Sequence, residues 1–193
     1  QDLNSTNKVK NAIRVGEIKV GDKKTKTKKH VLYDYKLICL YDKNFPKELK
    51  NKELCLVYFI VVDEEIYKIG KSSGKSGISG CLNFYLIAGT DDSGLSRFSV
   101  NWVMREELAK NKKVEIYMIY RDGFNIEVPG LFETKTKFSV DPTKAMEKHC
   151  LDEFRKKQKT LPKWNLQEGG LQNRSDIKEA FGKYIGQRGK DSK

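Results

Sequence analysis

Residues 54–70, LCLVYFIVVDEEIYKIG, constrain the fold of this chain more than any other segment. A run rich in Val, Ile, Leu and aromatic side chains leads into three acidic residues at 63–65 and out into a second, shorter apolar run. Because β-branched and aromatic side chains favour strands and polar turn residues separate them, the segment predicts a β-hairpin. Tyr58 then lies on the first strand, and Lys68 and Gly70 lie on the second.

The faces on which Tyr58 and Lys68 project depend on the length of the turn. A three-residue loop at 63–65 pairs Val62 with Ile66. Because side chains alternate along a strand, this register places Tyr58 and Lys68 on one face of the sheet, whereas a two-residue loop places them on opposite faces. We expect the three-residue loop. Taken alone, the two residues have ordinary interpretations, a core aromatic and a solvated lysine.

The charge balance predicts a polyanionic partner. The 193-residue chain has 38 Lys and Arg against 26 Asp and Glu, a formal net charge of +12. The basic residues cluster, as in residues 23–30 (KKTKTKKH), and nucleic acid is the commonest partner of such clusters. This stretch is interpreted as a mobile solvated arm or as an arm that grips DNA phosphates.

The cysteines indicate the compartment. Cys39, Cys55, Cys81 and Cys150 form no Cys-x-x-Cys pair, and only two histidines accompany them, so a zinc site of the usual spacing is not expected. Reduced, mostly buried thiols of this kind predict an intracellular, cytoplasmic protein. No apolar run reaches the length of a membrane span, and no signal peptide is visible, so no membrane partner is expected.

The pattern along the chain predicts an α+β fold, a small and mainly antiparallel three-stranded sheet flanked by helices. The third strand is expected near residues 114–118, where apolar residues alternate with polar ones. The helix beginning at Asp141-Pro142 has a typical N-cap and first helical residue. The expected helices cover residues 78–88, 99–111, 142–159 and 177–185.

Two segments are left open by the pattern. Residues 31–41 suit either a helix or a strand, and residues 121–140 suit either an irregular segment or a hairpin. The expected organisation is a basic N-terminal arm with a docking segment (1–50), a core (51–164) and a C-terminal extension (165–193).

Glu147 interrupts the apolar face of its expected helix. At about 100° per residue it falls inside the arc of apolar side chains between Met146 and Leu151. A buried carboxylate is costly unless it is paired or binds a cation. Glu147 is therefore interpreted as half of a structural ion pair with Lys68 or Arg105, or as a metal ligand or acid–base group.

Together these residues resemble the GIY-YIG endonucleases. Leu56-Val57-Tyr58 corresponds to the first triplet of the family's motif and Lys68-Ile69-Gly70 to the second. Lysine in place of the second motif tyrosine is similar to a branch of the family's type II restriction endonucleases. The order of elements, ending in a helix that bears a glutamate, is also similar, and the resemblance spans residues 54–164.

The resemblance implies hydrolysis of DNA with one divalent ion, Mg²⁺ or another such as Mn²⁺. Glu147 would be the metal ligand, and Tyr58 the general base or the group that orients the attacking water. Lys68 would favour the phenolate of Tyr58 and stabilise the transition state. The residues expected to contact DNA are Lys71, Ser72, Ser73, Lys75 and Arg97.

One position departs from the family pattern. Members carry an arginine on the first helix after the hairpin, and alignment on Tyr85 places Cys81 at that catalytic position. A thiol cannot donate the charged, bidentate hydrogen bonds of a guanidinium. Three explanations are open: Cys81 is an inactivating replacement, which is the preferred one, Arg97 or Arg105 reaches the site, or the chain binds DNA without cutting it.

The resemblance as a whole implies a site-specific double-stranded DNA endonuclease of the type II restriction type. A homodimer is expected because palindromic sites match a two-fold axis. The alternatives are a repair or homing-type nuclease of the same superfamily and a non-catalytic DNA-binding module. Residues 121–140, the N-terminal arm and the tail after residue 164 are expected to carry specificity or dimerisation.

Overall fold

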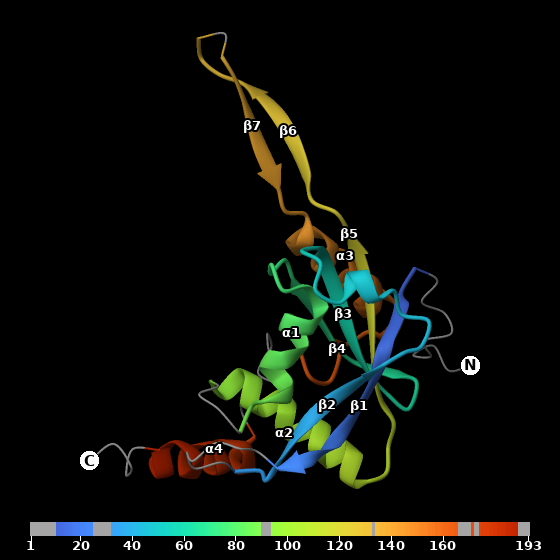
Figure 1. The fold of residues 1–193 in the computed structure, drawn as a ribbon, viewed down its shortest axis with the longest axis vertical. Helices are drawn as coiled ribbons and strands as arrows, with labels where there is room; N and C mark the ends of the chain where they lie inside the picture. Colours follow the sequence, from blue (N-terminus) through green and yellow to red (C-terminus); the bar gives the residue numbers. More distant parts are fainter. Residues whose placement is uncertain are drawn as a thin grey trace.

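The structure is a computed structural model that describes residues 11–24, 32–89, 94–132, 134–165, 171 and 174–188 (Figure 1). Its centre is a five-stranded sheet built from β1 (Ile13–Lys24), β2 (Tyr35–Tyr41), β3 (Cys55–Val62), β4 (Glu65–Ser72) and β5 (Val114–Arg121). The strand order is β2-β1-β5-β3-β4, and every neighbouring pair is antiparallel. The fold is therefore α+β, as expected.

The expected three-stranded sheet is wrong, because β1 and β2 extend it to five strands. β1 comes from a segment expected to be an arm, and it lies between β2 and β5. Its side chains Val15 and Ile18 are fully buried, although the neighbouring Glu17 and Lys19 are charged. The polar and Lys-rich composition of residues 1–30 made the segment read as a solvated arm. Residues 25–30 of the Lys-rich stretch lie outside the described residues.

The described part of the chain contains four α-helices, α1 (Gly77–Leu86), α2 (Leu95–Ala109), α3 (Thr143–Gln158) and α4 (Ser175–Arg188). α3 packs on the face of the sheet that presents Val57, Phe59 and Val61. The other helices contribute to the larger core on the opposite face. A short 3-10 turn, η2 (Lys47–Leu49), precedes β3. None of the helices described combines the length and the apolar character that crossing a membrane requires.

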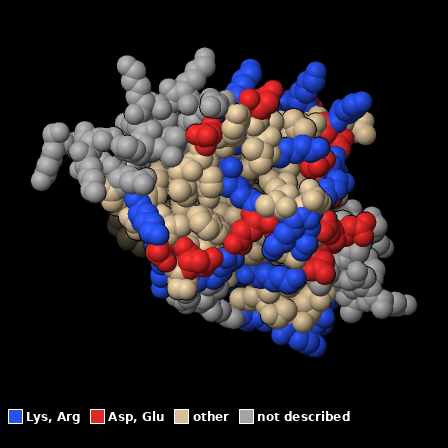
Figure 2. All heavy atoms as spheres, turned by 90° about the horizontal axis from the view of Figure 1, so that it is seen from below, with Lys and Arg blue, Asp and Glu red and all other residues tan. Residues whose placement is uncertain are grey.

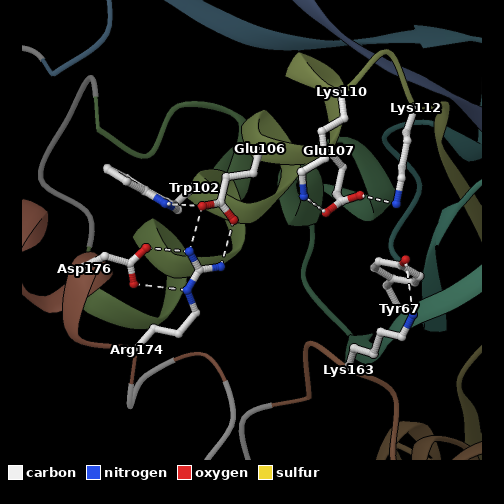
Figure 3. A network of polar contacts seen from close by, with 9 residues as sticks. All are labelled: Tyr67, Trp102, Glu106, Glu107, Lys110, Lys112, Lys163, Arg174 and Asp176. Atoms are coloured by element: carbon white, nitrogen blue, oxygen red, sulfur yellow. Dashed lines mark hydrogen bonds and ion pairs between the residues drawn. The ribbon is translucent and has the colours of Figure 1, made fainter.

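The C-terminal helix is fastened to α2 by an ion pair (Figure 3). Arg174 donates two hydrogen bonds to the carboxylate of Glu106, both at 2.7 Å, and this contact holds the pKa of Glu106 below its usual value. Trp102 donates a third hydrogen bond to the same carboxylate at 3.1 Å. Beneath this contact, Ile177 and Tyr184 of α4 are buried in the larger core.

The expected division at residues 50 and 164 stays a prediction. Side chains from all three segments meet in one hydrophobic cluster, which contains Val15 from the first, Leu56 from the second and Tyr184 from the third. The sheet likewise joins the first two segments, because β1 is hydrogen-bonded to β5.

Residues 121–140, left open between two interpretations, form a hairpin of β6 (Phe124–Pro129) and β7 (Lys135–Val140). Its strands pair with each other in a separate two-stranded sheet. The hairpin projects away from the body of the molecule (Figure 1). All the side chains of β6 and nearly all those of β7 are exposed.

Candidate active site

The turn between β3 and β4 is shorter than expected. Val62 pairs with Glu65, which leaves a two-residue turn of Asp63 and Glu64. Both turn residues have positive φ, 45° and 70°, as a tight hairpin turn of this length requires. The expected three-residue loop is therefore wrong. By itself, the shorter turn would have placed Tyr58 on the face opposite Lys68.

A β-bulge reverses that consequence. Between the pairs Ile60–Lys68 and Val61–Ile66, β4 contains one extra residue. The extra residue shifts the alternation of β4 by one position, so Lys68 projects on the same face as Ile60. Since Ile60 and Tyr58 are two residues apart on one strand, Tyr58 and Lys68 share a face after all.

The ring of Tyr58 lies across the backbone of β4 at Gly70, its partner in the register. A Cβ atom at residue 70 would lie 2.3 Å from the phenolic oxygen and 2.4 Å from the ring carbon that carries it. Only glycine leaves room for the ring. The glycine of the motif therefore allows the phenol to extend over β4, which is an edge strand of the sheet.

Tyr85 on α1 meets Tyr58 at this point. Their phenolic oxygens are 2.6 Å apart. Burial raises the pKa of both, and it raises that of Tyr58 well above its usual value near 10, so both phenols are neutral at pH 7. The sequence analysis used Tyr85 only to align the helix. Its position one helical turn after Cys81 was the available signal, since residues four apart share a helix face.

Lys68 is buried beside this phenol pair, with only 8% of its surface exposed. Burial lowers its pKa, while the negative charge of Glu147 acts in the opposite direction. Burial and neighbouring groups hold the phenol of Tyr58 protonated in the protein alone, and the expectation that Lys68 favours its phenolate stays a prediction.

Asn165 fixes the strand that carries Lys68, and the sequence analysis did not identify it. Its side-chain amide accepts a hydrogen bond from the N–H of Ile69 and donates one to the carbonyl of Ile69, both at 2.9 Å. The N–H of Trp164 donates to the carbonyl of Tyr67 at 2.7 Å. These hydrogen bonds cover the outer edge of β4 at the residues before and after Lys68, and they hold the backbone of Lys68 in place.

Glu147 reaches the site from α3. Only 9% of the residue is exposed, and its carboxylate lies 2.6 Å from the ammonium group of Lys71. Its charge also raises the pKa of Tyr58 and of Tyr85. The interpretation of Glu147 as a buried-face carboxylate is consistent with this burial, but the partner in its ion pair is Lys71, not Lys68 or Arg105.

Cys81 lies within the same cluster. Its side chain is buried and hydrogen-bonded to Ser72, and burial raises the pKa of the thiol to about 11. The positive charge of Lys68 acts on this thiol, so position 81 faces the buried lysine. At neutral pH the residue contributes a small neutral group, not a charge.

The two arginines considered as substitutes lie in different surroundings. Arg97 is exposed, stacks 4.0 Å from the ring centroid of Phe84 and lowers the pKa of Tyr85 through its charge. Arg105 donates a hydrogen bond to the carbonyl of Tyr35 at 2.7 Å and is held in the interior. Arg97 therefore lies near the phenol pair, whereas Arg105 has a structural role.

The loop after β4 is tied to the start of α3. Asp141 accepts a hydrogen bond from the N–H of Thr143 at 2.8 Å and others from the hydroxyls of Thr143 and Ser73. These bonds lower the pKa of Asp141 to about 2. Lys71 and Lys75, on the same segment of chain, are exposed. The helix begins at Thr143, one residue later than expected.

The donor set suits one divalent ion. Within the described ranges, no three His, Cys, Asp or Glu side chains gather in a group that could enclose a metal. Mg²⁺ commonly binds through one or two carboxylates and completes its shell with water and substrate phosphate. Glu147 offers one such carboxylate beside Tyr58 and Tyr85. It would hold the ion if the ammonium of Lys71 moved aside.

No protein-family model and no curated protein sequence matches the chain. Its fold is similar to that of a mutant of bacteriophage T4 EndoII, with 17% identity and a TM-score of 0.47, over 75% of this chain and 87% of that one. It is also similar to the restriction endonuclease Hpy188I in complex with product DNA, with 19% identity and a TM-score of 0.40, over 81% of each chain. Both similarities are at low sequence identity.

Proposed function

We propose that the chain is a divalent-metal-dependent endonuclease that cuts double-stranded DNA at specific sites, as type II restriction enzymes do. One observation carries the proposal: four separate elements, β3, β4, α1 and α3, bring together Tyr58, Lys68, Tyr85 and Glu147 at the edge of the sheet. Buried polar groups of this kind are costly for stability and are typical of functional sites.

Tyr58 would orient the attacking water. Its hydroxyl is neutral in the protein alone and shares a hydrogen bond with the hydroxyl of Tyr85, which holds it in place. Positive charge near the phenol, from Lys68 and from a bound cation, would favour loss of the Tyr58 proton to solvent, and the resulting phenolate would accept a proton from the attacking water. Lys68 would stabilise the negative charge that develops on the phosphate.

Glu147 would hold the divalent ion beside this pair of phenols. When bound, such an ion acts as a Lewis acid on the phosphate and the leaving oxygen. Its single protein carboxylate leaves the other coordination positions to water and substrate.

The flanking DNA would follow a groove along α3. Its lining includes four basic residues, Lys71, Lys144, Lys148 and Arg155, and two acidic ones, Glu147 and Asp152, of which Asp152 is paired with Lys148. By contrast, basic and acidic side chains intermingle on the face seen from below, at the end away from the β6–β7 hairpin (Figure 2). The groove, with four basic residues to two acidic ones, is therefore the surface we propose for phosphates, and Ser72, Ser73, Lys75 and Arg97 are further proposed DNA contacts outside its lining. We further propose a cytoplasmic homodimer.

The test is digestion of a sequenced supercoiled plasmid with and without Mg²⁺, alongside Glu147→Gln. Discrete bands that require Mg²⁺ and disappear with Glu147→Gln support the restriction type. A smear, or cutting at branched or damaged DNA only, would favour the repair or homing-type alternative. Glu147→Gln that retains Mg²⁺-dependent cleavage would contradict the assignment of the metal ligand.

A second candidate is supported by Cys81. With a neutral thiol at this position, the site lacks the clamp that a guanidinium would provide for the phosphate. A chain that binds DNA with a steep dependence on salt and yet leaves the plasmid intact in Mg²⁺ and in Mn²⁺ is a DNA-binding module.

A further inference from the structure

Asn101 is a fully buried polar residue of α2. Phe98 and Met104 of the same helix are buried with it and belong to the larger hydrophobic cluster. A buried side-chain amide is costly unless its donors and its acceptor are hydrogen-bonded. Asn101 meets this requirement through contacts with α1 and with a second residue of α2, and these contacts show what the residue holds together.

The amide nitrogen of Asn101 caps the end of α1. It donates hydrogen bonds to the main-chain carbonyls of Tyr85 at 2.6 Å and of Leu86 at 3.3 Å. These are the last two residues of α1, and the carbonyls at a helix end have no partner within the helix. The last turn of α1 holds no basic side chain, and the N–H of Ala88 lies farther from the Tyr85 carbonyl, at 3.4 Å. The end of α1 is therefore fastened to α2 chiefly through Asn101.

Arg105 fixes the orientation of this amide. It lies one helical turn after Asn101, and its Nε donates a hydrogen bond to Oδ1 of Asn101 at 2.8 Å. Because Oδ1 accepts this bond, Nδ2 has to face the end of α1. The guanidinium is itself anchored, since it donates to the carbonyl of Tyr35 at 2.7 Å and stacks 3.7 Å from the ring centroid of Tyr33. A continuous chain of contacts therefore runs from the start of β2 through Arg105 and Asn101 to Tyr85.

We infer that Asn101 is a positioning residue for the phenol pair, because it holds the main chain of Tyr85 where the Tyr85 hydroxyl meets that of Tyr58. Tyr85 is fixed at both ends, with 2.6 Å between its carbonyl and Nδ2 of Asn101 and 2.6 Å between the two hydroxyls. Helix ends fray, and Tyr85 is the second-last residue of its helix. A displacement of about 1 Å would lengthen the contact between the hydroxyls beyond the range of a hydrogen bond.

Ser99 provides the matched control for a role in packing alone. It is fully buried on the same helix, but its hydroxyl donates to the carbonyl of Leu95 at 2.7 Å and so bonds within α2. Ser99→Ala removes a buried hydrogen bond of α2 and leaves the end of α1 as it is. If Asn101 only stabilised the core, its replacement and that of Ser99 would have the same effect on the phenol pair.

The inference rests on the proposed function only for its effect on cleavage, and its main test needs neither DNA nor metal. The tyrosines of the full chain are labelled with ¹³C at Cζ, and the resonances of Tyr58 and Tyr85 are assigned by their loss in Tyr58→Phe and Tyr85→Phe. In Tyr85→Phe, the Tyr58 resonance reports a hydroxyl without its partner. Asn101→Asp keeps the size of the side chain and its contact with Arg105 but removes the donor. Asn101→Leu keeps the volume without a charge, and it is used if the first variant does not fold.

Replacement of Asn101 should move the Tyr58 resonance at least half of the way to its value in Tyr85→Phe, and Ser99→Ala should leave it in place. Single-turnover cleavage should slow at least about 10-fold, since a misplacement of about 1 Å can cost up to 100-fold, and this loss should vanish in a Tyr85→Phe background.

An unmoved Tyr58 resonance in a folded Asn101 variant would overturn the inference, and so would an equal movement in Ser99→Ala. A cleavage loss that persists in full without the Tyr85 hydroxyl would also count against it. A chain that does not cut DNA, but whose Tyr58 resonance moves as expected, would support the positioning role and count against the nuclease alone.

Discussion

The ammonium of Lys71 lies 2.6 Å from the carboxylate of Glu147, which is the proposed metal ligand. Lys71 lies near the end of β4 and its side chain is partly exposed, whereas the Glu147 side chain is largely buried. The lysine is therefore the mobile partner. In the absence of DNA it neutralises the carboxylate, and a phosphate could draw it away and free the carboxylate for a cation.

Lys71→Met should increase the affinity of the free protein for Mn²⁺. Removal of the competing ammonium leaves a largely buried carboxylate that needs a cation, and we expect a gain of roughly 3- to 10-fold for a partly exposed pair. Paramagnetic resonance of Mn²⁺ measures it directly. Lys75→Met, in the loop that follows β4, is the control and should leave the affinity unchanged. Equal affinity in the two variants would show that Lys71 does not compete.

Tyr58→Phe should slow cleavage by roughly two to four decades, the scale of general acid–base catalysis. The ring stays over Gly70, so thermal stability should change little. Tyr85→Phe should slow cleavage less, because it removes only the hydrogen-bond partner that lies 2.6 Å from the Tyr58 hydroxyl. Single-turnover cleavage rates at one plasmid site show which of the two variants is slower. Near-normal cutting by Tyr58→Phe would leave Tyr58 as a core aromatic.

Gly70→Ala should destabilise the protein by about 1–3 kcal/mol, because the added methyl group overlaps the ring of Tyr58 and overpacking carries costs of this size. The overlap is specific to that ring. In a Tyr58→Ala background the same change at residue 70 should therefore cost much less. Urea unfolding of the four proteins in this double-mutant cycle measures the coupling. An additive cycle would show that the ring and the glycine are independent.

Cys81→Arg should restore or raise cleavage, by about 100-fold or more if the guanidinium stabilises the transition state as an oxyanion donor does. Because the thiol is buried beside Lys68, the larger cation should also lower thermal stability. Cys81→Ser is the control for loss of the thiol alone. Efficient cleavage by the unaltered chain would show that another residue stabilises the phosphate in place of an arginine at position 81. Arg97, near Tyr85, would then be the next residue to replace.

Stability should depend on pH through Asp141. Its pKa in the folded protein, about 2, is lower than its ordinary value near 3.8, so its hydrogen bonds stabilise the fold above the ordinary value. That contribution is lost as the pH falls from about 4 through about 2. Asp141→Asn should lower the urea midpoint at pH 7 by an amount that corresponds to about 1 kcal/mol, and the difference should shrink across that window. A constant difference would exclude ionisation as its cause.

The sequence analysis predicted the shared face of the hairpin correctly, but from the wrong turn. The shared face of Tyr58 and Lys68 was expected from a three-residue loop, yet it results from a two-residue turn combined with a bulge. Two errors of one residue cancel, because side chains alternate with a period of two. A bulge has no sequence signature as clear as a turn, so this arrangement could not be predicted from the residues alone.

Other parts of the site depend on tertiary contacts that a pattern does not contain. Glu147 was identified because a helix has a fixed period, but its pairing with Lys71 requires the loop after β4 to lie beside α3. Asn165 bonds to Ile69, 96 residues away in sequence. Local periodicity predicts which face a residue occupies, whereas the identity of its partner depends on how the elements pack.

The place of β1 inside the sheet sets an order of events during synthesis. Ile13 of β1 pairs with Met118 of β5, which is about 100 residues further along the chain. At ordinary rates of translation, β1 therefore leaves the ribosome roughly 5–20 s before its partner β5. During that interval β2 can pair with one edge of β1, while the other edge of β1 stays exposed to non-native pairing with other strands. Glu17 and Lys19 lie within β1. The charged side chains that led to the prediction of a solvated arm would therefore also disfavour aggregation of β1 before β5 is made.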